Sequence, residues 1–519
     1  MTEDVIIGVD AGTSVIKVVA FDTEGNQLGV ASRRNHYSTL PGGGAEQDMA
    51  RTWQDCAAVL KGLAEEVPDL DRRALGLGVT GQGDGTWLID AAGKPVHDGW
   101  LWLDARSASA AQAIVDSDGH DLIYRTTATG VNVCQMRSQL CWMKENAPDL
   151  LARAATALHC KEWLYFRLTG ERAGDPSEGV FTFGDYRQRD YSDAVIAALG
   201  LSALRHLLPP IVDGAKTAHG LTEQAAAATG LPQGLPVSLG YVDIMCSAMG
   251  AGLHDAGVQP GLTVLGSTGM HMRFVPDADA VVLNKAASGY TMPFPGCAYA
   301  QMQTNMAATI NIDWMLDLAI GLLHSEGVER SRADLLAGLD DRILAARPGA
   351  ALYHPYILVA GERGPFVDPA ARASFTGIAQ GTGWFDLMRA VFDGLVLAAR
   401  DCYTAMGPIP AEIRISGGAA RSAAARKMLA SALNRPVRSV NQDEAGAAGA
   451  AMMAAVQLGV FPDIAAASDA WVTPRLGATV TPEAALVPVY DTLFDAYLAT
   501  RAAMPPVWQA QATMREALT

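Results

Sequence analysis

Two short loops carry the residue types that phosphate chemistry needs. The first is Asp10-Ala-Gly-Thr-Ser14, in which a carboxylate precedes a turn with free amides and hydroxyls. The second, Gly266-Ser-Thr-Gly269, repeats the theme about half a chain length later. Turn amides can form an anion-binding nest, and a nearby acid can orient a hydrated Mg²⁺–phosphate complex. Two such loops facing each other could clamp one polyphosphate, although short Asp-Gly-Thr segments also occur as ordinary turns.

A single carboxylate, Asp243, stands between a predicted strand over residues 235–243 and a predicted helix of small residues over 244–250. A carboxylate in this position can cap the helix. It can also act as a general base if the strand end faces a cleft. The local sequence leaves both interpretations open.

A glycine-rich turn, Ser416-Gly-Gly-Ala-Ala-Arg-Ser422, joins a predicted strand to a predicted helix. Glycines there let the backbone approach a ligand, and a helix N-terminus favours an anion or a nucleoside edge. The segment is neither G-x-G-x-x-G nor a Walker A sequence, so it indicates neither a dinucleotide fold nor a P-loop. A tight structural turn is the alternative.

Polar and aromatic residues alternate in Gly81-Gln-Gly-Asp-Gly-Thr-Trp87 and Trp100-Leu-Trp-Leu-Asp-Ala-Arg106. Such residues on strand ends could bind hydroxyl groups, with tryptophan as an apolar platform. The alternative is that Asp84 belongs to a hairpin turn and that Asp104 and Arg106 form a structural ion pair. The candidate substrate residues in these segments are Gln82, Asp84, Trp102, Asp104 and Arg106.

The elements around these loops indicate an α/β protein with mixed sheets. Short apolar strands alternate with helical spacing in both halves of the chain. Each half opens with a strand, a Gly-Thr or Gly-Ser-Thr turn and a second strand, which suggests either an internal duplication or a chance repeat. The expected strands are 5–10, 15–21, 74–79, 261–275 with its turn, 412–416 and 436–440, and the expected helices are 53–65, 387–406, 422–433 and one from 444 onward.

The composition excludes several classes of function. Lys plus Arg number 39 and Asp plus Glu 55 in 519 residues, a net charge of −16, which argues against general binding to nucleic acid or an anionic membrane. The seven cysteines contain no C-x-x-C pair, which favours reduced thiols in a cytoplasm. The N-terminal residues lack a basic segment, and no run of 18 apolar residues occurs, so we expect neither a signal peptide nor a membrane span.

A longer pattern resembles a known family. Ala373-x-Phe375-x-Gly377-Ile378 is followed after seven residues by Asp386-Leu387-x-x-Ala390-Val391-Phe392-Asp393. This matches the C-terminal signature of the FGGY carbohydrate kinases, which belong to the actin/hexokinase superfamily, and the resemblance runs from Val5 to about Trp508. It implies two ribonuclease-H-like α/β domains, residues 1–253 and 254–519, with the active cleft between them.

The resemblance also implies ATP and Mg²⁺ as cofactors and assigns roles to the loops described above. Asp243 matches the catalytic base, and Asp10 would orient the metal through water. Residues that match the ATP and phosphate segments are Asp10, Gly12, Thr13, Ser14, Lys17, Gly266, Ser267, Thr268, Gly417, Gly418, Ala419 and Ser422. The expected substrate residues are Gln82, Asp84, Trp102, Asp104, Arg106 and Asp243.

Within the family, four segments resemble the erythritol kinases: residues 80–88, 303–309, 353–356 and 361–366. The xylulokinase sequence Gly-Gln-Met-His-Gly is here Gly81-Gln-Gly-Asp84-Gly85, and a carboxylate in place of an imidazole favours a polyol over a ketose. We therefore expect a small-molecule polyol substrate, erythritol first, with a pentulose or another polyol as the alternative. A non-catalytic ATP- or sugar-binding switch protein is the remote alternative, and family precedent suggests a homodimer.

Overall fold

The computed structural model describes residues 4–518 and contains two large mixed sheets. The first has the strand order β12-β13-β6-β1-β2-β3 and the second the order β16-β17-β15-β14-β20-β21-β22. The strands of the first sheet are β1 Val5–Ala11, β2 Val15–Phe21, β3 Gln27–Arg34, β6 Ala74–Gly81, β12 Ala218–Gly220 and β13 Pro236–Leu239. Those of the second are β14 Gly261–Leu265, β15 Gly269–Val275, β16 Tyr290–Pro293, β17 Tyr299–Asn305, β20 Ile413–Ser416, β21 Val437–Val440 and β22 Leu476–Val480.

The two sheets share one topology. In the first, β1 pairs antiparallel with β2 and parallel with β6, and β6 pairs parallel with β13. In the second, β14 pairs antiparallel with β15 and parallel with β20, and β20 pairs parallel with β21. Each central strand therefore has its hairpin partner on one side, and two successive parallel strands follow on the other. The expectation of two similar α/β units is confirmed, and the repeated topology supports an internal duplication.

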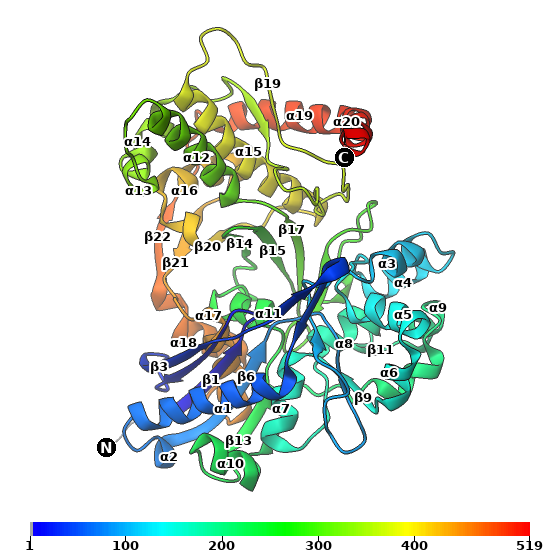
Figure 1. Ribbon diagram of the computed structural model, residues 1–519. Coiled ribbons are helices and arrows are strands. Elements are labelled where there is room, and N and C mark those ends of the chain that lie inside the picture. The colour runs from blue at the N-terminus through cyan, green and yellow to red at the C-terminus, as the bar shows by residue number, and fades with distance from the viewer. Residues whose placement is uncertain (1–3, 519) are drawn as a thin grey trace.

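Two helices, α11 (Asp243–Gly250) and α17 (Ala445–Gln457), lie where the two sheets meet (Figure 1). Although α17 comes late in the chain, it covers one face of the first sheet. A Cβ added at Gly8 would lie 2.0 Å from the carbonyl oxygen of Ala447, and one at Gly449 would lie 1.9 Å from that of Cys246. The small side chains of α17 thus allow backbone contact with both β1 and α11, as its Gly- and Ala-rich sequence predicts.

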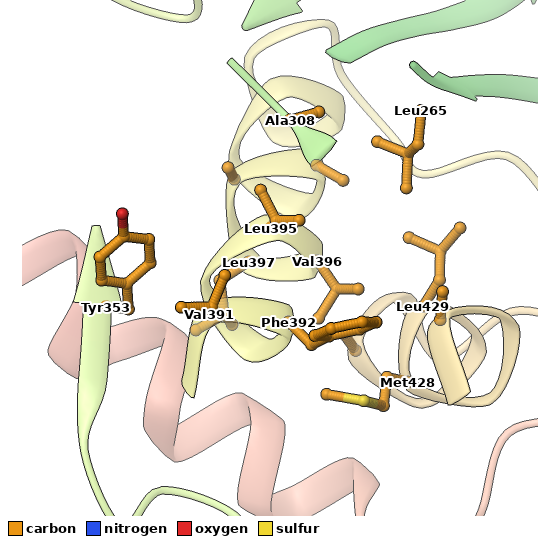
Figure 2. Close-up of a cluster of buried hydrophobic side chains, with 14 of the residues drawn as sticks. Leu265, Ala308, Tyr353, Val391, Phe392, Leu395, Val396, Leu397, Met428 and Leu429 are labelled. Carbon is orange, nitrogen blue, oxygen red and sulfur yellow. The ribbon is translucent and has the colours of Figure 1, made fainter. Parts of the chain in front are cut away.

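Further helices cover the outer faces of the sheets. The outer face of the first sheet packs against α1 (Met49–Glu66), α7 (Cys160–Thr169) and α10 (Glu223–Thr229). The second sheet packs against α15 (Trp384–Ala405) and α16 (Ala423–Leu433), where Phe392 and Val396 of α15 lie beside Met428 and Leu429 of α16 (Figure 2). The remaining helices of the second half are α12 Thr309–Ser325, α13 Arg332–Leu336, α14 Leu339–Ala345, α18 Ile464–Trp471, α19 Val487–Ala503 and α20 Pro505–Leu518.

Apart from α7, the helices between β6 and β12 belong to a side lobe with its own apolar core (Figure 1). Its helices are α3 Ala108–Val115, α4 His120–Thr127, α5 Met136–Asn146, α6 Pro148–Arg153, α8 Pro176–Phe183 and α9 Asp193–Ala198. Short elements complete the fold: α2 Leu70–Arg73, β4 Ser38–Leu40, β5 Gly44–Gln47, β7 Trp87–Ile89, β8 Gly99–Trp100, β9 Thr156–Leu158, β10 Gly184–Asp185, β11 Asp190–Tyr191, β18 Leu352–His354 and β19 Ser374–Thr376. No helix within residues 4–518 is long and apolar enough to cross a membrane.

One predicted element is shorter in the structure. The strand expected over 235–243 ends at Leu239, because the next residues turn toward α11 and Gly240 donates its N–H to the carbonyl of Val79. The strands of the first sheet all precede residue 240 and those of the second all follow residue 260. The boundary between residues 253 and 254 stays a prediction, and the outermost predicted residues, 1–3 and 519, lie outside the described part of the chain.

Candidate active site

The two phosphate-type loops line one cavity of about 660 Å³. The first connects β1 to β2 and the second connects β14 to β15, so each is the tip of the central hairpin of its sheet. Sequence-predicted site residues in the cavity lining are Asp10, Gly12, Thr13, Lys17, Asp84, Trp102, Asp243, Gly266, Thr268 and Gly417. The lining does not include the predicted residues Ser14, Gln82, Asp104, Arg106, Ser267, Gly418, Ala419 and Ser422.

Asp10, near the end of β1, has a buried carboxylate oxygen, Oδ1, without a hydrogen-bond partner. Its other oxygen lies against the start of α17, since a Cβ added at Gly446 would lie 2.2 Å from Oδ2. Burial raises the pKa of Asp10 to about 6; the charge of Lys17 opposes this and that of Glu444 adds to it. An unpaired buried carboxylate beside a phosphate-type loop fits a cation that arrives with a ligand.

Lys17 of β2 forms an ion pair with Glu444, which precedes α17. The distance from Lys17 Nζ to Glu444 Oε2 is 2.8 Å, and both residues line the cavity. The pair connects the first hairpin to a segment from the last quarter of the chain. Lys17 therefore lies at the cavity, as expected of a phosphate ligand, with its charge balanced by Glu444.

Asp243 is the first residue of α11, and Val242 holds the N-cap position. The helix-cap interpretation is therefore wrong: Asp243 Oδ1 accepts only the N–H of the adjacent Ile244, at 2.6 Å. Burial, followed by the charge of Asp10, raises the pKa of Asp243 to about 8. A carboxyl group that lines a cavity and titrates near neutral pH has the properties of a general base.

The backbone before Asp243 is held from two sides. Val242 donates its N–H to Ser177 Oγ at 2.9 Å, and Thr80 of β6 donates its hydroxyl to the carbonyl of Tyr241. Ser177 in turn donates to the buried carboxylate of Asp175, which caps α8. These contacts fix the position of the Asp243 carboxyl group relative to the first sheet.

Asp84 combines the two alternatives that the sequence left open. Asp84 and Gly85 both have positive φ angles, 53° and 79°, so the segment is a tight turn. The carboxylate of Asp84 also lines the cavity, where Oδ2 accepts from the thiol of Cys134 at 3.3 Å and buried Oδ1 has no partner. Burial raises the pKa of Asp84, while the Cys134 contact and the charges of His159, Arg363 and Arg137 oppose that rise.

A group of charged residues lies buried behind Asp84. Asp84 donates its backbone N–H to Glu178 Oε1 at 3.0 Å, and His159 lies between Glu178 and Glu162, with Nδ1 3.0 Å from Glu162 Oε2. Lys161 pairs with Glu162 and Asp175. Burial opposes the charge of His159, but the two glutamates outweigh it and raise the pKa of His159 above its ordinary value. The group supports the turn that carries Asp84.

Thr13 forms hydrogen bonds with two other predicted site residues, Gln82 and Trp102. Its hydroxyl donates to Gln82 Oε1 at 2.9 Å and accepts from Trp102 Nε1 at 2.8 Å. Gln82 also donates to Gln47 at 2.6 Å and is buried, so it holds the first phosphate-type loop without lining the cavity. Trp102 is 39% exposed and lines the cavity beside Thr13.

Asp104 and Arg106 form the ion pair that the sequence offered as their structural alternative. Arg106 Nη2 lies 2.6 Å from Asp104 Oδ2 and 2.7 Å from Glu46 Oε1, and its guanidinium carbon lies 3.5 Å from the centre of the Trp100 ring. Asp104 Oδ2 also accepts the N–H of Ala45 at 2.8 Å. Both residues are occupied with protein partners, and their assignment to substrate stays a prediction.

The glycine-rich turn after β20 meets the cavity only at its start. Ser416 and Gly417 belong to the lining. Gly417 has a φ angle of 86°, and a Cβ there would lie 2.7 Å from the carbonyl oxygen of Leu265, beside the second phosphate-type loop. At the other end, Ser422 caps α16 and donates to Asp340 at 2.6 Å. Binding of a nucleoside by this turn stays a prediction.

Two family-wide sequence models match the chain in order. The N-terminal domain of the FGGY family of carbohydrate kinases matches residues 5–250, and the C-terminal domain of that family matches residues 261–458. Together the two matches cover most of the chain. The chain belongs to the FGGY family of carbohydrate kinases.

Individual relatives agree with this membership. The FGGY kinase described here is 51% identical over 512 residues to the erythritol kinase of Brucella abortus, with 98% of each chain covered. It is 25% identical to the xylulose kinase of Bacillus subtilis over 95% of each chain. The crystal structure of xylulose kinase from Rhodospirillum rubrum, 26% identical, matches with a TM-score of 0.87 over 97% of this chain and 100% of that one. The expected family and the expected two-domain fold are confirmed.

Several lining residues were not singled out from the sequence. They include Glu178, Tyr290, Arg363 and Glu444. Glu178 could have been suspected as a carboxylate in an otherwise apolar helical segment. Arg363 belongs to a segment that was recognised as a family feature, Gly361 to Phe366, but to which no role was assigned. Its position at the cavity depends on how a long loop of the second half folds back.

Proposed function

We propose that this FGGY kinase transfers the γ-phosphoryl group of ATP to a terminal hydroxyl of a short polyol, erythritol in the first place. The observation that carries the proposal is the placement of Asp243 in one cavity with both phosphate-type loops. Similarity to an erythritol kinase over nearly the full length supports the choice of polyol. A location in the cytoplasm, where reduced thiols persist, agrees with the seven free cysteines, and the homodimer stays a prediction.

In the proposed reaction Asp243 accepts the proton of the substrate hydroxyl. The hydroxyl oxygen forms a bond to the γ-phosphorus, the bond from that phosphorus to the bridging oxygen breaks, and ADP leaves. General-base assistance of this kind contributes about 10²–10⁴-fold to the rate, and positioning supplies much of the remainder. The raised pKa of Asp243 suits this role because a base of higher pKa accepts a proton more readily.

The residues of the first loop fit a Mg²⁺ ion that accompanies the nucleotide. Within residues 4–518 no group of three or more His, Cys, Asp and Glu side chains could hold a metal. Mg²⁺ in nucleotide sites is held through one or two carboxylates, phosphates and water, and when bound it neutralises phosphate charge. Asp10, with its unpartnered Oδ1, would orient the ion through water. Thr268 would contribute a hydroxyl contact to the phosphates, and Thr13 would do so on giving up the hydrogen bond that it donates to Gln82.

A ketose is the second candidate substrate, because xylulose kinases are also among the relatives of this chain. Asp84 favours the polyol, since an unpartnered carboxylate oxygen accepts a hydrogen bond from a hydroxyl and repels the oxygen of a carbonyl. A site built to bond a particular hydroxyl discriminates strongly against analogues without it.

A substrate panel tests the proposal. Erythritol, threitol, glycerol, ribitol, xylitol, xylulose and ribulose are compared in an assay that couples ADP release to a colour change. We expect the highest kcat/KM for erythritol. A ketose that exceeds erythritol tenfold or more would overturn the polyol assignment while leaving the kinase intact. ADP release that is independent of every added alcohol would instead favour a binding switch.

A further inference from the structure

The part of the cavity around Asp84 is rich in carboxyl groups, which, when they are ionised, only accept hydrogen bonds. Asp84, Glu178 and Asp243 all contribute carboxyl groups to the lining. Polyol hydroxyls both donate and accept, so a site for them also needs donors. Two of the substrate residues expected from the sequence, Gln82 and Arg106, can donate, but they do not line the cavity and are bonded to other residues. Another donor is therefore needed.

Two basic side chains, Lys17 and Arg363, occur in the lining formed by the described residues. Lys17 is paired with Glu444 at the first phosphate-type loop. Arg363 comes from the loop between β18 and β19 and lines the same cavity as Asp84. Its charge lowers the pKa of Asp84 and opposes the effect of burial. Among residues 4–518 no carboxylate forms an ion pair with Arg363 within 4.0 Å, and Arg363 and Asp84 both line the cavity.

The backbone around Arg363 is fixed to the end of β17. Glu362 Oε1 accepts the N–H of Met306 at 2.9 Å and that of Arg363 at 2.8 Å. Asn305 donates to the carbonyl of Gly364 at 2.7 Å. A Cβ at Gly364 would lie 2.6 Å from the carbonyl oxygen of Thr304, so the loop lies directly against the strand. Arg363 is thus held on the second sheet, across the cavity from Asp84.

The guanidinium group of Arg363 has N–H donors that form no hydrogen bond with the described part of the chain. Its Nε donates to Thr304 Oγ1 at 3.1 Å, and this is the one hydrogen bond of the guanidinium group that the described part of the chain provides. The two terminal nitrogens remain available toward the cavity. A planar guanidinium can donate two parallel hydrogen bonds, which suits the oxygens of two adjacent hydroxyls.

We propose that Arg363 is a substrate-binding residue that donates hydrogen bonds to adjacent hydroxyls of the polyol, opposite the acceptor Asp84. The substrate would then be held by both halves of the chain, with its acceptor contacts from the first and its donor contacts from the second. The inference rests on the proposed function, since it assumes a polyhydroxylated substrate in this cavity. It adds that a residue of the second half selects this substrate.

The test compares Arg363→Met with Arg372→Met. Arg372 lies in the same loop, donates to the carbonyls of Pro369 and Ala371 and does not line the cavity, so it is a matched control. Steady-state rates are measured with erythritol and with 1,4-butanediol, which keeps the terminal hydroxyls but has no adjacent pair. We expect Arg363→Met to lower kcat/KM for erythritol at least tenfold and for butanediol less than threefold, with the KM for ATP within twofold of wild type. Arg372→Met should change none of these values.

Equal losses with both alcohols, or a value for erythritol within twofold of wild type, would overturn the proposal. If Arg363→Met does not fold, Arg363→Lys serves instead. It keeps the charge but cannot donate two parallel bonds, and the same difference between the two alcohols is expected at three- to tenfold. Failure of the proposed function would be visible in the wild-type enzyme, which would then prefer a ketose in the substrate panel. That panel is measured before any variant is made.

Discussion

Two groups of carboxylates near the first phosphate-type loop differ in how they are partnered. Asp104 is buried and bonded to Arg106 and to the N–H of Ala45. Asp243 is only partly buried at the cavity and accepts one local N–H, and the largest effect of a neighbouring charge on it comes from the like charge of Asp10. A paired carboxylate contributes to stability, whereas an unpaired one that lines a cavity is held in an unfavourable state by the fold around it. The comparison separates the residues that build the site from those that react in it.

The largest expected effect follows from removing the unpaired carboxylate. Asp243→Asn should lower kcat at least about 100-fold, because the variant loses general-base assistance worth roughly 10²–10⁴-fold. Nucleotide affinity, measured by isothermal titration calorimetry, should stay within a few-fold of wild type. Asp104→Asn is the matched control, with kcat reduced less than fivefold. Comparable loss of turnover in both variants would contradict the distinction between the two groups.

The same two variants should change stability in opposite directions. The native pKa of Asp243 is about 8 and its ordinary value is 3.8, so between these values the native state binds more protons than the unfolded state. Wild-type stability is therefore reduced as pH rises through this window. At pH 7 Asp243→Asn should increase the free energy of unfolding by up to about 4 kcal/mol. Asp104→Asn should decrease it by roughly 2 kcal/mol, because charged hydrogen bonds are lost. Urea unfolding measures both.

A smaller effect is expected from substitution of Asp84, the turn residue in the part of the cavity proposed to bind the substrate. Asp84→His should lower the ratio of kcat/KM for erythritol to that for xylulose at least about tenfold, because the acceptor for a hydroxyl is replaced. The coupled ADP assay with both substrates measures this ratio. An unchanged ratio in a folded variant would mean that Asp84 serves only the turn with Gly85.

The pH dependence of the reaction gives the most gradual effect. Since Asp243 must be deprotonated to accept a proton, kcat/KM should rise with pH and level off above its pKa of about 8. The increase should be about tenfold per pH unit well below that value. Initial rates in buffers of constant ionic strength give the profile. A rate that is level from about pH 6 upward would remove the raised pKa of Asp243 from the mechanism.

The residues around the cavity show which features of the site a local sequence pattern can predict. The loops at Asp10 and Gly266 were predicted from a few adjacent residues, because a strand, a turn and a strand form a hairpin through local contacts. Asp104 and Arg106 have residue types that suit hydroxyl binding, yet their side chains bond to Glu46 and to each other. The type of a charged residue limits what it can bind, and its partners in the folded chain decide what it does bind.

The sequence by itself determined the family, the two repeated hairpins and the identity of the acid at the start of α11. Each of these depends on neighbouring residues or on motifs in a fixed order along the chain. Only the tertiary structure decided which side chains share the cavity. Arg363 reaches it because β17 holds its loop there, and Glu444 does so because α17 returns to cover the first sheet. Such contacts join residues far apart in the sequence, so no local pattern could have predicted them.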